Sequence, residues 1–203
     1  MAGNTHGAAG RSLNHLFHTR PLALVVIGGA VFLLLSLIVA ILPALALREQ
    51  SRAAMATMTA PDASVLRGRQ VYLREGCGYC HSQFIRPTLI DLPYGRASRV
   101  EDFAGQVPPV PGTQRTGPDL SNVGNRQPSW MWQFMHLYNP RSMVPQSIMP
   151  SFPWYFDIVD TAEGGNSTYA MVLGPDFIPD GKVAIPTQEA IDLVAYLRSL
   201  KQE

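Results

Sequence analysis

The feature that most constrains this chain is a short motif that holds its only two cysteines, Cys77-Gly78-Tyr79-Cys80-His81. Two cysteines separated by two residues and followed at once by a histidine are typical of a c-type haem attachment site. In such a site both thiols become thioethers to the haem, and the histidine is an axial ligand of the iron. The motif therefore predicts one covalently bound haem c, tethered by Cys77 and Cys80, with His81 on the iron.

Three other uses of the cysteine pair are open on the motif alone. A thioredoxin-like dithiol is expected within a βαβ pattern, and none is visible around this motif. A disulfide across two intervening residues is geometrically tight. A zinc site needs about four nitrogen or sulfur ligands, and no second Cys or Cys/His pair lies nearby in the sequence. Haem c is the interpretation that the rest of the chain supports.

A long uncharged segment, residues 22–47, precedes the motif and is dominated by Leu, Val, Ile and Ala. At ~1.5 Å per residue it is long enough to cross a hydrocarbon core of ~30 Å with some tilt. A cleaved signal peptide is the alternative, because Ala44-Leu45-Ala46 looks like a cleavage site, but the apolar run far exceeds the usual ~7–15 residues. The sequence predicts a retained transmembrane helix at 22–47, between an N-terminal segment, 1–21, and a small, polar linker, 48–64.

The charges at the two ends of this helix are nearly balanced. Arg11 and Arg20 precede it, and Arg48 and Arg52 follow it, so the positive-inside rule discriminates weakly. The acid-free N-terminus favours the cytoplasm, and c-type haem is attached outside the cytoplasm. We therefore expect a single-pass protein of the bacterial inner membrane, with a cytoplasmic N-terminus and a periplasmic haem domain, residues 65–203.

Helical patterns recur in three parts of this domain. Residues 65–75 have one apolar stripe, and Gly68 lies on it, where another helix can approach closely. Residues 129–138 place their large apolar side chains on one face. Residues 187–200 have a broad apolar face, with Tyr196 placed to cross the turn that contains Gly68. These patterns predict an all-α domain whose first and last helices cross.

Long irregular connections, residues 82–116 and 151–185, separate these helices. Such loops inside a compact domain are uncommon unless they are functional, so we interpret the first as a partner-facing surface. The second begins with an aromatic cluster, residues 152–156, which is suited to the core or to an interface. The first loop also offers candidate ligands for haem propionates, although scattered arginines are more often solvated: Arg86, Arg96, Arg99 and Arg115.

Two motifs after the cysteines complete the predicted iron site. Gly117-Pro118-Asp119-Leu120 offers the carbonyl of Pro118 as an acceptor for the second ring nitrogen of His81. Met149, in a non-helical stretch before a proline, is the expected second axial ligand; a thioether raises the reduction potential relative to two histidines. His136 competes for that position, as do the other methionines, with Met143 the closest rival: Met131, Met135, Met143 and Met171.

The order of these elements resembles a class I cytochrome c over roughly residues 65–200: a glycine-bearing helix, the cysteine motif, Gly-Pro-Asp-Leu, Met-Pro and a final helix. The resemblance implies a small all-α fold around a haem ligated by histidine and methionine. The expected architecture is thus a single N-terminal transmembrane helix, followed by a class I cytochrome c domain with long irregular loops.

Longer matches narrow the resemblance. They are Arg-Glu-Gly-Cys at 74–77, His-Ser-Gln at 81–83, Ile-Arg-Pro at 85–87, Arg-Thr-Gly-Pro-Asp-Leu at 115–120, His-Leu-Tyr-Asn-Pro-Arg at 136–141 and Val-Pro-Gln-Ser-Ile-Met-Pro at 144–150. With the single N-terminal span, they resemble the mono-haem membrane subunit (subunit II) of cbb(3)-type cytochrome c oxidases. In that family the subunit passes electrons to a separate catalytic subunit, which reduces oxygen at a haem–copper centre. A further c-type cytochrome subunit is an expected partner. The proline-rich run 107–111 departs from this pattern.

Catalytic motifs are not evident in the sequence: there is no nucleophile triad, phosphate-binding loop or justified carboxylate pair. A net charge of +1 gives no bias towards nucleic acid, and none is expected as a partner. We therefore expect an electron-transfer subunit with no catalytic residues of its own, bound to the lipid bilayer and to other subunits. The cytochrome c subunit of a related nitric oxide reductase and a free membrane-anchored relay stay open as alternatives.

Overall fold

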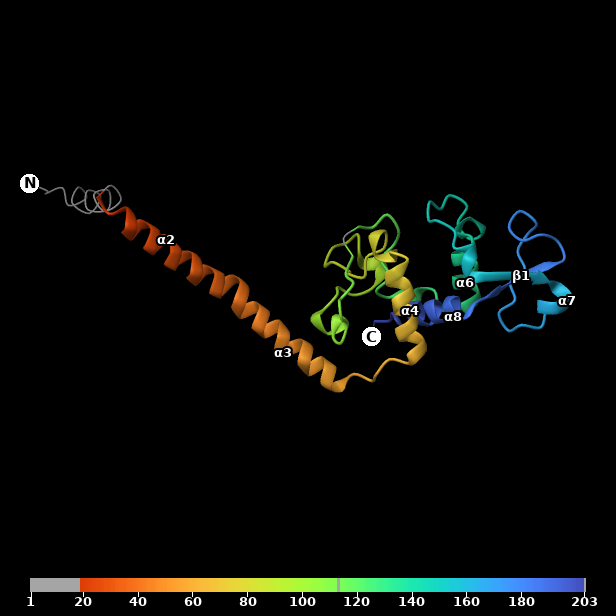
Figure 1. Ribbon diagram of the computed structural model, residues 1–203, viewed down its shortest axis with the longest axis horizontal. Helices are drawn as coiled ribbons and strands as arrows, with labels where there is room; N and C mark the ends of the chain where they lie inside the picture. The colour runs from red at the N-terminus through yellow and green to blue at the C-terminus, as the bar shows by residue number, and fades with distance from the viewer. Residues whose placement is uncertain (1–18, 113, 203) are drawn as a thin grey trace, which may run out of the picture. The chain divides into compact units, whose positions relative to one another are not determined.

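The computed structural model describes residues 19–112 and 114–202, and the chain divides into two units between Ala56 and Thr57. Most of the expected N-terminal segment, residues 1–21, lies outside the described residues. The described part of the first unit is one long helix, made of α2 (Pro21–Ser36), a wide π-helical turn (Leu37–Ile41) and α3 (Leu42–Thr57) (Figure 1).

This helix, Pro21–Thr57, is long and apolar enough to cross a membrane, as the sequence predicted. Its wide turn lies just before Pro43, which has no N–H to donate, and the Leu42 N–H bonds to the carbonyl of Leu37 five residues back. Residues 48–57, expected in the linker, continue the helix. They are mostly good helix formers, and Glu49 pairs with Arg52 at 2.7 Å one turn later.

The described chain is largely helical with little strand and has one apolar N-terminal helix, so the expected fold class is confirmed. The helices of the second unit are α4 (Ala63–Arg74), α5 (Val123–Arg126), α6 (Trp130–Tyr138), α7 (Thr161–Gly164) and α8 (Gln188–Ser199), and its strands are β1 (Phe156–Asp160) and β2 (Lys182–Pro186). Single 3-10 turns, such as η2 (Cys77–Tyr79), connect them. Buried side chains from α4, α5, α6 and α8 and from the segments around β1 and β2 form one core.

Helices α4 and α8 cross at the glycine that the sequence singled out (Figure 1). A Cβ atom on Gly68 would lie 1.8 Å from the backbone oxygen of Asp192 and 2.9 Å from Cβ of Tyr196. Beside this contact the rings of Tyr72 and Tyr196 meet edge to face, with centroids 5.3 Å apart. The predicted crossing of the first and last helices of the domain is therefore confirmed.

The connection 151–185 is more ordered than we expected from the sequence. Strands β1 and β2 pair antiparallel within it, with Phe156 opposite Pro186 and Asp160 opposite Lys182. Met171 forms a further bridge to Ala184, and both residues are buried. The sequence did not predict these two strands, because strands so far apart in the sequence form their pairing only in the folded chain.

The aromatic cluster at the start of this connection contributes mainly to the core. Phe152, Tyr155 and Phe156 are buried, whereas Trp154 is 61% exposed. Of the two uses that the sequence left open for this cluster, core packing applies to three of the four aromatic residues. Trp154 alone has the exposure that an interface anchor needs.

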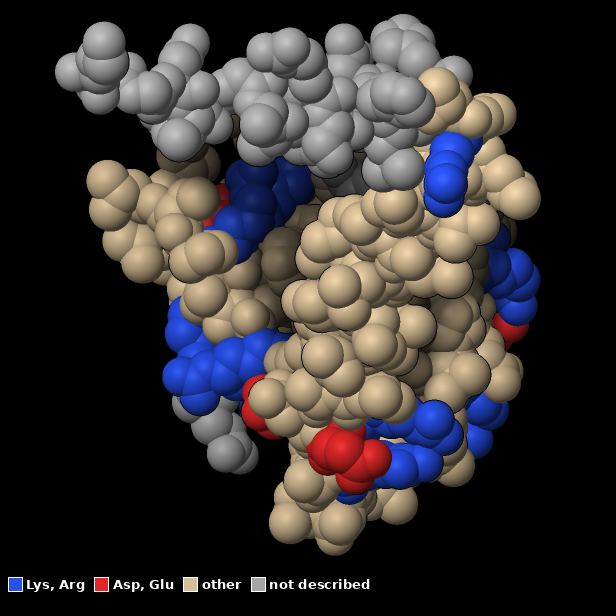
Figure 2. All heavy atoms as spheres, turned by 90° about the vertical axis from the view of Figure 1, so that its left-hand side faces the viewer, with Lys and Arg blue, Asp and Glu red and all other residues tan. Residues whose placement is uncertain are grey.

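The connection 82–116 combines short turns with an apolar tip. It contains the 3-10 turns η3 (Leu92–Tyr94) and η4 (Val100–Phe103), while Leu89 and Ile90 are 85% and 79% exposed. On the face shown in Figure 2, basic side chains form separate groups among uncharged residues, with few acidic side chains between them.

Candidate functional site

The cysteine motif begins where α4 ends. Gly76 adopts a left-handed conformation, with φ of 69°, and the chain then makes the single turn η2. The amide of His81 donates to the carbonyl of Cys77 at 2.9 Å, which brings the histidine back towards the two cysteines. Both thiols are free, so the structure contains no disulfide between Cys77 and Cys80. Burial raises the pKa of the Cys77 thiol to about 12, and the thiol is therefore neutral at pH 7.

The imidazole of His81 is oriented by the second motif. Its Nδ1 lies 2.8 Å from the carbonyl oxygen of Pro118, and because a carbonyl only accepts, Nδ1 must be the donor. Nε2 is then left with its lone pair, as an iron ligand requires. Burial lowers the pKa of His81, which favours the neutral ring. A Cβ atom on Gly117 would lie 2.3 Å from Cε1 of the ring, so this close approach requires glycine.

A buried network of ion pairs supports the loop that carries His81 and Pro118. Asp91 is fully buried and accepts two bonds of 3.0 Å from the guanidinium of Arg86 and a further bond from Arg115. Arg115 also donates to Oγ of Ser82 at 2.7 Å and lies 3.5 Å from the carboxylate of Asp119. The network thus connects residues on both sides of the His81–Pro118 hydrogen bond.

The arginines considered for haem propionates have other partners. Arg86 and Arg115 pair with Asp91, and Arg96 pairs with Asp102 at 2.7 Å. None of these three lines the cavity described below, and neither does Arg99. The three paired arginines therefore help to organise the loop 82–116, although the side chain of Arg86 is still half exposed.

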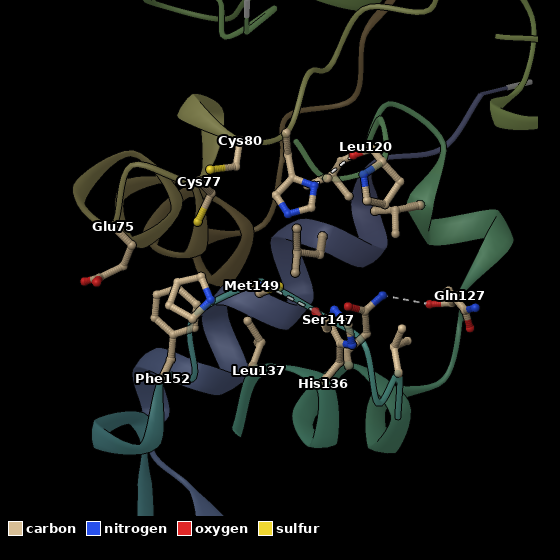
Figure 3. Close-up of a pocket in the computed structure, with 18 of the residues that line it drawn as sticks. Glu75, Cys77, Cys80, Leu120, Gln127, His136, Leu137, Ser147, Met149 and Phe152 are labelled. Carbon is tan, nitrogen blue, oxygen red and sulfur yellow. Dashed lines mark hydrogen bonds between the residues drawn. The ribbon is translucent and has the colours of Figure 1, made fainter. Parts of the chain in front are cut away.

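A cavity of about 580 Å³ lies in front of the cysteine motif (Figure 3). Its volume is within the ~300–1,000 Å³ that is typical of cofactor sites. Cys77, Cys80, His81, Pro118 and Met149 all line it. Apolar side chains from α5, α6 and α8 and from the segment before β1 form most of the remaining wall, among them Val123, Leu137, Phe152, Leu193 and Leu197.

Two of the candidates for the second axial ligand, Met149 and His136, line the cavity. Of the methionines that the sequence offered, Met149 lines the cavity, while Met131, Met135, Met143 and Met171 are not among its lining residues. His81 lines the same cavity from a segment far away in the sequence, and Figure 3 shows Met149 in the pocket with the two cysteines. His136 also lines the cavity, and its ring stacks on Trp132 at 4.7 Å.

Arg141 holds the segment that presents Met149. Its guanidinium donates to the carbonyl oxygens of Ser147 and Met149, each at 3.1 Å, and to Oγ of Ser151 at 2.7 Å. One side chain thus clamps both ends of the short stretch around the methionine. This role of Arg141 was not predicted from the sequence, because neither hydrophobic periodicity nor ligand spacing indicates which backbone carbonyls an arginine will reach.

Other polar lining residues were also missed, namely Arg126, Gln127, Trp132, Gln133 and Gln146. They come from the short helix α5, the start of α6 and the Met149 loop, and no fixed spacing from the cysteine motif identifies them. Within the described residues no three His, Cys, Asp or Glu side chains gather as a metal site. An iron here would take its remaining ligands from a macrocycle, and the free thiols, oriented imidazole, thioether and apolar walls fit a haem.

Comparison with known families agrees with this geometry. The family described as cytochrome c oxidase, mono-heme subunit/FixO, matches residues 14–174. The chain belongs to this family. The match covers the apolar helix, the cysteine motif, Pro118 and Met149, and it stops before α8. Among curated proteins, none matches the chain closely enough to count as a relative.

Membership of the mono-haem subunit family confirms the resemblance found in the sequence and accounts for the cavity. The family implies a haem, association with a cytochrome c oxidase complex and, together with the apolar helix, attachment to a membrane.

Proposed function

We propose that this chain is the membrane-anchored, mono-haem c electron-transfer subunit of a cbb(3)-type haem–copper oxidase. It relays electrons to the catalytic subunit, which reduces oxygen. The observation that carries the proposal is the convergence of Cys77, Cys80, His81 and Met149 on one apolar cavity, in a chain of the mono-haem oxidase family.

The cysteines hold the cofactor in this proposal. Each S–H would add across one haem vinyl group, so that sulfur bonds to one carbon, hydrogen goes to the neighbouring carbon and no oxidant is consumed. The free thiols of Cys77 and Cys80 on the cavity wall suit this addition. Two covalent bonds keep the haem on the chain through every redox cycle.

The axial residues then restrict the chemistry to electron transfer. His81 offers Nε2, held by the Nδ1 bond to Pro118, and Met149 offers its sulfur from a loop clamped by Arg141. If both residues held the iron of a bound haem, no site on it would be open to oxygen. A bound haem supplies a one-electron couple, whose potential the thioether ligand raises. The chain is thus a non-catalytic subunit of a catalytic complex.

The topology belongs to the same proposal. The helix Pro21–Thr57 anchors the chain once in the bacterial inner membrane, with its N-terminus in the cytoplasm and the haem domain in the periplasm. The partners are the catalytic haem–copper subunit, which reduces oxygen, and a further c-type cytochrome subunit. The exposed apolar tip at Leu89 and Ile90 suits a partner-facing surface.

Metal analysis of the native complex tests the proposal. The chain is purified from native membranes with whatever it holds, and copper, non-haem iron and b- and c-type haem are counted. Copper together with b- and c-type haem is the expected result. Non-haem iron without copper would assign the chain to a nitric oxide reductase instead. If the preparation contains neither copper nor non-haem iron, the chain is a free membrane-anchored relay.

A further inference from the structure

Strand β1 has one hydrogen-bonded edge and one open edge. Its partner β2 also pairs with Met171, whose amide donates to the carbonyl of Ala184 at 2.8 Å and whose carbonyl accepts from the Ala184 amide at 3.0 Å. Because the peptide groups of Ala184 face Met171, those of Ile158, which lies opposite Ala184 on β1, face away from β2. Within the part of the chain that the structure describes, neither the N–H nor the C=O of Ile158 has a hydrogen-bond partner.

The core holds this open strand in place. At its start the buried ring of Phe156 meets those of Phe134 and Tyr138 edge to face, with centroids 6.3 and 5.4 Å apart. Helix α7 packs on the sheet through Gly164, where a Cβ atom would lie 2.3 Å from Cγ2 of Val159. A fixed strand with unused donors and acceptors is a template for one more strand, and it loses little entropy when that strand binds.

The segment around this edge, residues 156–186, is acidic. It contains five acidic residues and one lysine, although the whole chain has a net charge of +1. All five acidic side chains are exposed: Asp157, Asp160, Glu163, Asp176 and Asp180. Among the described residues only Asp160 has an ion-pair partner, Lys182 at 3.3 Å. Figure 1 shows β1 and α7 at the end of the second unit opposite the connection 82–116, so this surface is separate from the apolar tip at Leu89 and Ile90.

These charges select among the possible occupants of the edge. A second copy of β1 would bring the same aspartates to the neighbouring strand, and β1 has no basic residue to pair with them. Charges on an exposed edge also prevent aggregation, but either sign of charge serves that purpose, whereas this segment is strongly biased to one sign. A basic extended segment satisfies both the open peptide groups and the unpaired carboxylates.

We propose that the open edge of β1 binds an extended segment of a partner protein, rich in lysine or arginine, as an added strand. The N–H and C=O of Ile158 pair with the backbone of that segment. Asp157 and Asp160 lie on opposite faces of β1 and contact its basic side chains. This interaction goes beyond electron transfer, because no residue of β1 lines the cavity.

Photo-crosslinking in native membranes tests which molecule occupies the edge. Ile158 of the full chain is replaced by p-benzoylphenylalanine, which keeps the N–H and both aspartates, and the crosslinked peptide is sequenced by mass spectrometry. Val172, which is 70% exposed in the same segment but lies on no strand, is replaced in the control. We expect a peptide of another protein that contains lysine or arginine, crosslinked from position 158 and not from 172. A crosslink to a second copy of this chain, or no crosslinked peptide, would overturn the inference.

Two variants at one position test the backbone contact. Ile158→Pro removes the outward N–H and leaves the bonds of β1 to β2 in place, because proline is tolerated on an open edge. Ile158→Thr is the matched control, since it keeps the N–H and a β-branched side chain. The probes are fluorescent peptides of alternating lysine and valine or of alternating glutamate and valine, and their dissociation constants are measured by anisotropy with the purified full chain in detergent.

The wild type should bind the lysine peptide more tightly than the glutamate peptide. Ile158→Pro should weaken binding of the lysine peptide ~5-fold, as expected for the loss of one hydrogen bond, and Ile158→Thr should change it little. The double variant Asp157→Lys with Asp160→Lys should reverse the preference, and it supplies the test if Ile158→Pro fails to fold. Equal binding of the two peptides to the wild type, equal effects of proline and threonine, or an unreversed preference in the double variant would overturn the inference.

Discussion

Replacing Gly68 with alanine tests whether the crossing of α4 and α8 holds the domain together. The added Cβ atom would lie 1.8 Å from the backbone oxygen of Asp192, whereas ordinary contact begins at 3.4 Å, so the helices must separate by about 1.6 Å. Backbone atoms cannot rotate away as a side chain can. Overpacking typically costs ~1–3 kcal/mol, and alanine recovers ~1 kcal/mol of helix propensity. With the cost at its upper end, we expect the free energy of unfolding to fall by about 2 kcal/mol.

The assay is urea denaturation of the full haem-loaded chain in detergent, followed by tryptophan fluorescence. Gly174→Ala is the matched control, because a Cβ atom there meets nothing within 4 Å. That substitution should leave stability unchanged or raise it slightly, by restricting the unfolded chain. If Gly68→Ala is as stable as the wild type, the reasoning from the helix crossing is refuted.

Two further predictions concern the methionine loop and acid stability. Arg141→Gln removes the donors to the carbonyls of Ser147 and Met149, so the ferrous chain should bind carbon monoxide more readily than the wild type or the control Arg198→Gln, which removes a donor to the carbonyl of Pro128 away from the cavity; equal binding in optical difference spectra would contradict the clamp. The pKa of Asp192 is held below its usual value, chiefly by the hydrogen bond from Arg67; its contribution to stability is therefore present above pH ~4 and lost as the pH falls further. Asp192→Asn should destabilise the chain at pH 7, and its difference in stability from the wild type should vanish below pH ~4. The control is Asp160→Asn, which removes an exposed ion pair with Lys182 and should have little effect. A difference in denaturation midpoints between Asp192→Asn and the wild type that does not change with pH would contradict this assignment.

Local sequence patterns were sufficient to predict those structural features that depend on neighbouring residues. The helices around Gly68 and Tyr196 each have their own apolar periodicity, and a glycine on such a stripe indicates close approach. Gly76 adopts the left-handed conformation that helix ends favour. Ser129 caps α6 by accepting from the amide of Trp132. These features were readable because their causes lie within a few residues.

The contact between His81 and Pro118 joins residues 37 positions apart, and it was predicted on different grounds from the helices. No periodicity brings the two residues together. The order of the motifs and their resemblance to class I cytochromes c suggested the contact, and the structure places the two groups within hydrogen-bond distance. Met149 reaches the same cavity in the same way, from a segment whose local pattern specifies only a restricted loop.

Other features could not be predicted from the sequence, because they arise only in the folded chain. Strands β1 and β2 pair across 21 intervening residues, and the sequence of neither strand indicates which segment it pairs with. The same holds for Arg141, whose acceptors are backbone carbonyls, and for Arg126, which reaches the cavity from a short helix. The first loop's arginines were considered for the haem because of their charge, but Asp91 and Asp102 determine where three of them lie.

Single-turnover oxidation of the reduced complex tests the central claim most directly. The native complex is fully reduced and mixed rapidly with oxygen, and the absorbance of the c-type haem on this chain is followed together with oxygen consumption. The account predicts that this haem is oxidised within the time of one turnover, and that Met149→Ala, which removes an axial ligand, slows that oxidation. Oxygen consumption at an unchanged rate while the c-type haem of this chain stays reduced would contradict it.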